Sequence, residues 1–134
     1  MKITKQINSS TFAKPMGAYS HGYIVDLGQS EMIFTTGQIA LDNEGNVVHP
    51  DNVEKQAEFV FESLQKILKE SGATLDDVVK ATIYVTDMAD FPKISPVRNR
   101  YFANSKPVST LVQVTSLVNP DCRVEIEVIA VKAK

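Results

Sequence analysis

The sequence predicts an α+β domain in which two helices cover one face of a mixed β-sheet. Its 134 residues, of which 43% are hydrophobic and 22% charged, suffice for one globular core. Apolar residues recur at strand spacing in some segments and at helical spacing in others. These segments follow in the order strand, strand, strand, helix, strand, helix, strand, strand, which is typical of this class. No repeat or linker interrupts them, so residues 1–134 are predicted to form a single domain.

A strand pair is predicted in the first third of the chain. The runs YSHGYIVDLG and EMIFTTGQIAL are rich in β-branched and aromatic residues, and GQS between them has the composition of a turn. The following DNEGN has the composition of a loop. The chain is therefore expected to pass from a hairpin through a loop into its first helix.

The first helix is predicted from its caps and its apolar spacing. Asp51 and Asn52 are both suitable N-cap residues, and Gly72 supplies a C-terminal stop. The apolar residues between them recur at helical spacing and predict the buried face: Val53, Ala57, Val60, Phe61, Leu64, Ile67 and Leu68.

A second, shorter helix is predicted within DFPKISPVRNRYFA. Proline has no N–H to donate and disrupts a helix interior, so Pro96 conflicts with a helix that starts at Asp90. Placing Ser95 at the N-cap and Pro96 at the first helical position removes the conflict. We therefore expect a short turn and then a helix that begins at Pro96.

Strands are predicted on both sides of the second helix. DDVVKATIYVTD precedes it, and STLVQVTS and RVEIEVIAV follow it. The apolar face of the first of these strands is predicted to consist of Val79, Ala81, Ile83 and Val85.

The last strand places two carboxylates among apolar residues. Side chains alternate along a strand, so Arg123, Glu125 and Glu127 share one face, opposite Val124 and Ile126. The pattern alone is that of a half-buried strand with its charges in water. Polar residues also recur on one face of the other strands, and this face is expected to be covered by association of subunits.

Charge and composition exclude several classes of partner and site. The formal net charge is −2 and the basic residues are dispersed, so neither nucleic acid nor an anionic membrane is an expected partner. The start MKITKQINSS lacks the apolar region of a signal peptide, and no run reaches the about eighteen apolar residues of a membrane span. A soluble cytoplasmic protein is expected. Cys122 is the only cysteine, and His21 and His49 have no ligand spacing, so no metal site is expected.

Several motifs resemble those of the YjgF/RidA family of small enamine and imine deaminases, from about residue 7 to residue 132. The similar stretches, in the same order and with similar spacing, are KPMGAYSHGY, MIFTTGQIALDNEG, QAEFVFESLQKILKESGATLDDVVKATIYVTDMADF, KPVSTLVQV and VEIEVIAV. The resemblance implies a chorismate-mutase-like fold assembled as a homotrimer. It also implies that a small-molecule metabolite binds in clefts between neighbouring subunits, without a cofactor.

The resemblance also implies roles for individual residues. In the family, a glutamate positions the water that attacks an imine carbon, and Glu125 matches it. Tyr19 matches a tyrosine that covers a flat substrate, although Ala18 replaces the proline that usually precedes it. Thr36 stands where the family often has serine. Glu127 is expected to remain a solvated or ion-paired residue.

One position departs from the family. An arginine in the motif Pro-x-Arg-Ser/Thr-x-Val holds the substrate carboxylate, but this chain has Ser109 at that position and Leu111 where cysteine is common. Ser95 stands where asparagine often precedes the second helix. A serine hydroxyl cannot replace the paired, charge-assisted hydrogen bonds of a guanidinium. A cleft lined by Tyr19, Thr36, Ser109, Thr110 and Leu111 is expected to suit a neutral or less charged molecule.

Other cations could replace the missing arginine. The candidates are Arg98, Arg100, Lys106 and Arg123, each of which is expected to be an ordinary surface charge.

Three functions follow from these residues. The first is a trimeric deaminase that hydrolyses reactive enamines or imines with water held by Glu125. The second is a non-catalytic trimer that binds a metabolite and contacts another protein. The third is the ribonuclease or translation inhibitor activity attributed to some family members, which ranks last because the chain is mildly acidic.

Overall fold

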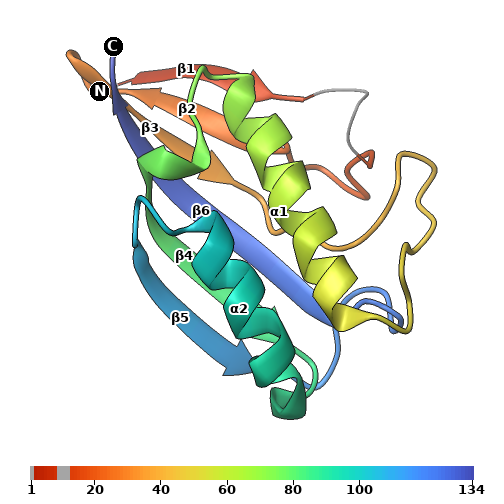
Figure 1. The fold of residues 1–134 in the computed structure, drawn as a ribbon. Coiled ribbons are helices and arrows are strands. Elements are labelled where there is room, and N and C mark those ends of the chain that lie inside the picture. Colours follow the sequence, from red (N-terminus) through yellow and green to blue (C-terminus); the bar gives the residue numbers. More distant parts are fainter. Residues whose placement is uncertain (1, 9–12) are drawn as a thin grey trace.

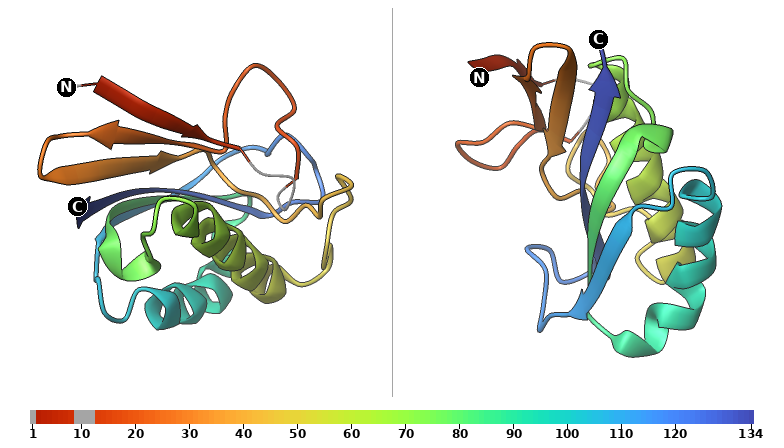
Figure 2. Two further views of the ribbon diagram at one scale, coloured as in Figure 1. Left: turned by 90° about the horizontal axis from the view of Figure 1, so that it is seen from above. Right: turned by 90° about the vertical axis from the view of Figure 1, so that its left-hand side faces the viewer.

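The computed structural model describes residues 2–8 and 13–134, and these form one six-stranded sheet with two α-helices on one side (Figures 1 and 2). The strand order is β1-β2-β3-β6-β4-β5, and only β4 and β5 are parallel neighbours. The predicted α+β class, with a mixed sheet and helices on one face, is confirmed. The elements are β1 (Lys2–Ile7), β2 (Gly22–Asp26), β3 (Ser30–Thr35), α1 (Val53–Lys69), β4 (Val78–Val85), α2 (Phe91–Tyr101), β5 (Val108–Gln113) and β6 (Val124–Ala133).

Helix α1 forms as predicted, and its cap is now assigned. The side chain of Asn52 accepts a hydrogen bond from the Lys55 backbone N–H at 3.0 Å, so Asn52 rather than Asp51 is the N-cap. Gly72 has φ +78°, the left-handed conformation that glycine adopts most easily after a helix. All the residues of the predicted apolar face are buried against the sheet and α2. The ring of Phe61 stacks on Tyr101, with 4.8 Å between centroids, and so joins the two helices.

The apolar face of β4 differs from the prediction at one residue. Ala81, Ile83 and Val85 are buried, but Val79 is 47% exposed and Val78 is buried in its place. The pairing with β6 shifts between Val78 and Lys80, which is the signature of a β-bulge. The bulge adds one residue to the strand and so reverses the alternation on its N-terminal side.

The predicted start of α2 is wrong. A 3₁₀ turn, Met88–Asp90, runs directly into a helix that begins at Phe91, so Pro96 lies inside the helix and Ser95 is not its N-cap. The turn is capped by Asp87, whose side chain accepts a hydrogen bond from the Ala89 N–H at 2.9 Å. Pro96 and the residue four positions earlier are both exposed, so the carbonyl that loses its helical partner can bond water. Packing of the helix against α1 therefore outweighs one missing hydrogen bond.

Strand β6 lies in the sheet interior and carries the predicted alternation. Val124, Ile126 and Val128 are buried beneath the helices, whereas Glu125 and Glu127 are partly exposed on the opposite face. Among the residues that the structure describes, no helix covers that face in a single chain (Figure 2). Sequence alternation and pairing register place several apolar side chains on this open face as well: Tyr23, Phe34, Val108 and Val112.

Candidate functional site

A cavity of about 300 Å³ brings together three of the predicted site residues. Tyr19 comes from the loop before β2, Thr36 from the loop after β3, and Glu125 from β6. Residues far apart in sequence therefore meet at the end of the sheet where β6 begins. This cavity is the candidate active site within one chain.

Backbone pairing places the loop after β3 against Glu125. The Gln38 N–H donates to the Ile126 carbonyl at 2.9 Å, and the Ile126 N–H donates back at 3.1 Å. This pairing sets Gly37 beside the Glu125 side chain. A Cβ at residue 37 would overlap a carboxylate oxygen of Glu125 and lie 2.8 Å from its Cδ. A side chain on residue 37 would displace the Glu125 carboxylate, and glycine lets the carboxylate lie directly against the backbone.

The carboxyl group of Glu125 has a raised pKa. Burial, which disfavours the charged form, is the main cause, and the negative charge of Glu127 adds to it. Within residues 2–8 and 13–134, no group donates a hydrogen bond to this carboxylate. The carboxylate is therefore available to hold a water molecule or a ligand, and its raised pKa lets it keep a proton at a higher pH than an exposed glutamate does.

Glu127 has a different environment. Its carboxylate accepts a hydrogen bond from the Tyr84 hydroxyl at 3.4 Å, and among the described residues it forms no ion pair. It points to the same face as Glu125, two residues away along the strand. Glu127 thus contributes a nearby negative charge rather than a second site carboxylate.

Tyr19 is 47% exposed at the edge of the cavity. Its hydroxyl oxygen accepts a hydrogen bond from the Met16 backbone N–H at 2.9 Å, which orients the ring over its own loop. The hydroxyl proton remains available for a ligand. The apolar ring face and a polar tip at the cavity edge suit a small, flat molecule.

Two basic residue types, a lysine and a histidine, also line the cavity, and sequence reasoning missed both roles. Lys14 is an exposed cation in the same loop as Tyr19, and His21 is buried. The Nε2–H of His21 donates to the Ala13 carbonyl at 2.8 Å, and this bond fastens the loop to β2. Both residues stand in the stretch KPMGAYSHGY, so the motif contained the signal. Met16, Leu41 and Val118 form apolar walls of the cavity.

The remaining predicted residues lie elsewhere in the chain. Ser109 lines a separate cavity of about 340 Å³ at the base of β5, on the helix side of the sheet. Leu111 packs against the core, and Thr110 lies on the open face, opposite Ser109. The hydroxyl of Ser95 accepts a hydrogen bond from Arg98 at 3.0 Å. A single chain does not unite these residues with Tyr19, Thr36 and Glu125, so a cleft that contains both groups stays a prediction about assembled subunits.

Residues 10–132 match the model of the endoribonuclease L-PSP family. The chain belongs to this family. It is the one that the sequence motifs indicated under the name YjgF/RidA. A RutC family protein of Pyrococcus abyssi is 40% identical over 119 residues, which cover 89% of this chain and 90% of that protein. The 2-iminobutanoate/2-iminopropanoate deaminase of Rattus norvegicus is 33% identical, over 97% of this chain and 91% of that protein.

The fold matches solved L-PSP family structures. The crystal structure of E. coli TdcF with bound serine has a TM-score of 0.83 and 33% identity to this chain, and the match covers 97% of this chain and 100% of that one. The arrangement of helices and sheet is therefore that of the family.

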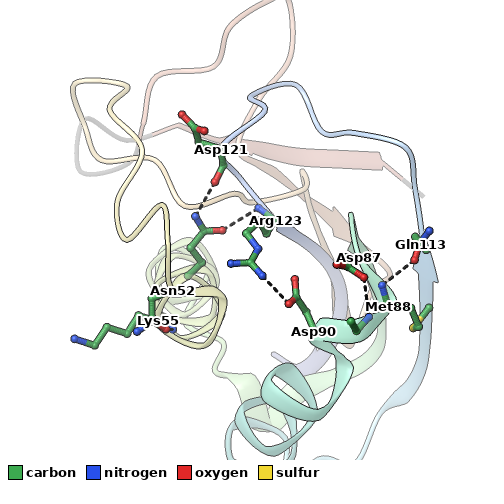
Figure 3. Close-up of polar contacts among 10 residues, drawn as sticks. Asn52, Lys55, Asp87, Met88, Asp90, Gln113, Asp121 and Arg123 are labelled. Carbon is green, nitrogen blue, oxygen red and sulfur yellow. Dashed lines mark hydrogen bonds and ion pairs between the residues drawn. The ribbon is translucent and has the colours of Figure 1, made fainter.

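Two of the four candidate cations are already paired in this family member. Arg123 donates to the buried carboxylate of Asp90 at 2.6 Å, and Figure 3 shows these side chains pointing toward each other. The Arg123 backbone N–H also donates to Gln56 at 2.9 Å, and Gln56 donates to the Asp121 carbonyl. This network joins α1, the start of β6 and α2. Arg100 forms an exposed pair with a glutamate of α1, and neither arginine lines the cavity beside Ser109.

Within the part of the chain that the structure describes, neither helix is both long and apolar enough to span a lipid bilayer. In the same residues, no group of three His, Cys, Asp or Glu side chains is placed to hold a metal ion.

Proposed function

We propose that this L-PSP family protein hydrolyses reactive enamines or imines of small metabolites. The observation that supports this function best is the position of Glu125, a half-buried carboxylate of raised pKa that lies against Gly37 and has no protein donor among the described residues. The reaction converts an imine and water into a carbonyl compound and ammonia. It requires a positioned water, a proton carrier and a surface that holds the substrate.

Glu125 acts as both base and acid in this proposal. Its carboxylate takes a proton from water as the water oxygen bonds to the imine carbon, and the imine nitrogen takes up a proton from solvent. The protonated Glu125 then gives its proton to the amine nitrogen, the C–N bond breaks, and ammonia leaves with the bonding electron pair. The remaining hydroxyl group loses its proton to solvent as the C=O bond forms. A raised pKa suits both steps because it makes the carboxylate a stronger base than an exposed glutamate, and the group can return the proton afterwards. The ring of Tyr19 covers the substrate at the cavity edge.

Two relatives support this reaction class. The rat relative is named for deamination of 2-iminobutanoate and 2-iminopropanoate, and the E. coli relative was crystallised with bound serine. Both names concern small molecules, and the cavity of about 300 Å³ has a matching size. Ser109 offers a hydroxyl where the family motif has arginine. We therefore expect Ser109 itself to bind the carboxylate of an imine more weakly than an arginine would.

The proposed active form is a homotrimer with clefts between subunits. The open face of the sheet exposes Phe34, Val108 and Val112, and a neighbouring subunit would cover them. Assembly would also allow Ser109 of one subunit to approach the Glu125 cavity of another, which a single chain does not achieve.

A second candidate function is binding of a metabolite without turnover. The observation that favours it is Ser109, since a cleft can keep its shape after loss of a substrate clamp. Ribonuclease activity ranks third because the net charge is −2 and counterion release drives most binding to nucleic acid.

The decay of 2-aminocrotonate generated by a threonine dehydratase separates these functions. We expect the wild-type protein to accelerate the decay and Glu125→Ala to lose about 10²- to 10⁴-fold of that acceleration, as for removal of a general acid–base. Ser109→Arg should raise activity on the carboxylated imine because it restores a guanidinium. No acceleration by the wild type, combined with ligand binding in calorimetry, would instead establish the non-catalytic function.

A further inference from the structure

We infer that the cavity beside Ser109 binds a small carboxylate and that Arg98, aided by Lys106, supplies the positive charge. This inference extends the proposed function. Only one part of it rests on that function, namely that the bound carboxylate belongs to the imine substrate. The binding site itself stands on the contacts around Ser109. It would make carboxylated molecules acceptable despite the missing family arginine.

The cations near Ser109 differ in what they contact. Arg123 is bonded to the buried Asp90, and Arg100 is bonded to Glu58. Arg98 and Lys106, in contrast, line the same cavity as Ser109, and neither forms an ion pair with a described residue. These two charges are therefore the ones available to a bound anion.

Arg98 is held in place by neutral groups. Its Nη2 donates to the Ser95 hydroxyl at 3.0 Å, and its Nε donates to the Asn99 side-chain oxygen at 3.1 Å. Among the described residues, no acceptor is bonded to its other N–H groups. The guanidinium is thus oriented by the helix but keeps donors and its full charge for a ligand. Ser95 positions Arg98 and need not touch the ligand.

Lys106 adds a second charge from the loop between α2 and β5. Its backbone has φ +45°, a left-handed conformation that costs energy for a residue with a Cβ. The conformation is held by a hydrogen bond from the Lys106 N–H to the Phe102 carbonyl at 2.9 Å. This bond joins the loop to the end of α2, and the lysine is part of the cavity wall.

The composition of the cavity favours a small organic carboxylate. Its described wall residues include two cations, the Asn99 amide and the Ser109 hydroxyl, and no acidic side chain. Phe102, Ala103 and Pro107 supply apolar surface for a short carbon chain. The volume of about 340 Å³ suits a molecule of a few carbon atoms, and the negative net charge of the protein opposes an extended polyanion.

Calorimetric titration with 2-oxobutanoate tests the inference without any turnover, since this keto acid is the hydrolysis product of 2-iminobutanoate. We expect Arg98→Gln to weaken binding about 10- to 100-fold, as for loss of a charge-assisted hydrogen bond, and Lys106→Gln to weaken it less. Arg98→Lys should lie between the wild type and Arg98→Gln because it keeps the charge but not the fork. Butanone, which lacks the carboxylate, should bind weakly to all of them.

Arg100→Gln is the matched control, because Arg100 lies on the same helix and is paired with Glu58. It should bind 2-oxobutanoate like the wild type. The melting temperature of each variant shows whether it folds. If Arg98→Gln fails to fold, the binding affinity of Arg98→Lys is compared with that of the wild type instead.

Three results would overturn the inference. The first is that Arg98→Gln binds 2-oxobutanoate as tightly as the wild type. The second is that Lys14→Gln loses binding instead, which would place the carboxylate in the Glu125 cavity. The third is that the wild type does not bind 2-oxobutanoate. Glu125→Gln separates the two proposals. If this variant loses turnover but still binds 2-oxobutanoate, both the deaminase function and the carboxylate site are supported. If the wild type binds 2-oxobutanoate but shows no turnover, the carboxylate site is supported and the deaminase function is contradicted.

Discussion

Glu125 shows how one side chain can become a candidate site residue on an otherwise ordinary strand. It shares the partly exposed face of β6 with Glu127, yet only Glu125 meets the loop after β3, where Gly37 leaves room for its carboxylate. The difference between the two glutamates is therefore one of neighbours rather than of residue type or strand face. Burial by those neighbours raises the pKa of Glu125.

The raised pKa of Glu125 predicts how stability depends on pH. The folded protein holds a proton on this carboxyl more tightly than the unfolded chain, so its stability decreases as the pH rises from the ordinary value of 4.5 through the raised pKa. Glu125→Gln removes the ionisable group. We expect this variant to be more stable than the wild type at pH 7 to 8 in urea unfolding, and the difference to shrink toward about pH 4.

An exposed loop carboxylate provides the control for this pH dependence. Glu44→Gln should leave the difference between pH 4 and pH 8 nearly unchanged, because Glu44 is exposed in the loop before α1. A Glu125→Gln variant that is less stable than the wild type at neutral pH would contradict the assigned effect of burial.

At the scale of elements, the spacing of apolar residues predicted the helices and strands in which that spacing is regular. It failed where a single residue interrupts the regular spacing. The hairpin, α1 and the alternation in β6 follow from spacing and caps, and all were predicted. The bulge at Val79 was not, since an inserted residue leaves the apolar composition of β4 unchanged. Pro96 was misassigned because its local preference was given more weight than packing of α2 on α1.

The position of Pro96 within α2 predicts a stabilising substitution. Pro96→Ala restores an N–H that can donate to the carbonyl of Pro92, which an interior proline lacks. An interior proline costs about 3 kcal/mol, and loss of its restraint on the unfolded chain offsets up to about 1 kcal/mol. We expect Pro96→Ala to stabilise the protein by roughly 2 kcal/mol, measured by urea unfolding.

Pro92 provides the comparison within the same helix. Pro92→Ala should change stability little, because Pro92 lies in the first turn, where N–H groups have no helical partner. If Pro96→Ala proved neutral while Ser95→Ala cost about 1 kcal/mol, the helix would instead begin with Ser95 as its N-cap.

At the scale of the whole molecule, the candidate site residues divide into two groups that only an assembly could unite. Tyr19, Thr36 and Glu125 meet in one cavity, and Ser109 lies in another on the helix side of the sheet. Sequence motifs could suggest these residues as candidates, since each motif is local. They could not show which cavity each one lines, because that depends on the pairing of strands distant in sequence and on contacts between chains.

The open sheet face predicts the effect of a charge placed on it. Val108 is 69% exposed at the start of β5 and pairs with Lys80, so Val108→Asp should be tolerated in a single chain. In a trimer that covers this face, an aspartate would lose hydration in every subunit, at several kcal/mol for each buried charge. We expect the wild type to sediment as three copies in analytical ultracentrifugation and Val108→Asp to sediment largely as single folded chains.

Leu27→Asp, at the exposed turn between β2 and β3, is the control and should remain trimeric. If Val108→Asp loses deaminase activity while its circular dichroism spectrum stays that of the wild type, the active site needs more than one subunit. If the single chain is fully active, the whole reaction takes place in the Glu125 cavity.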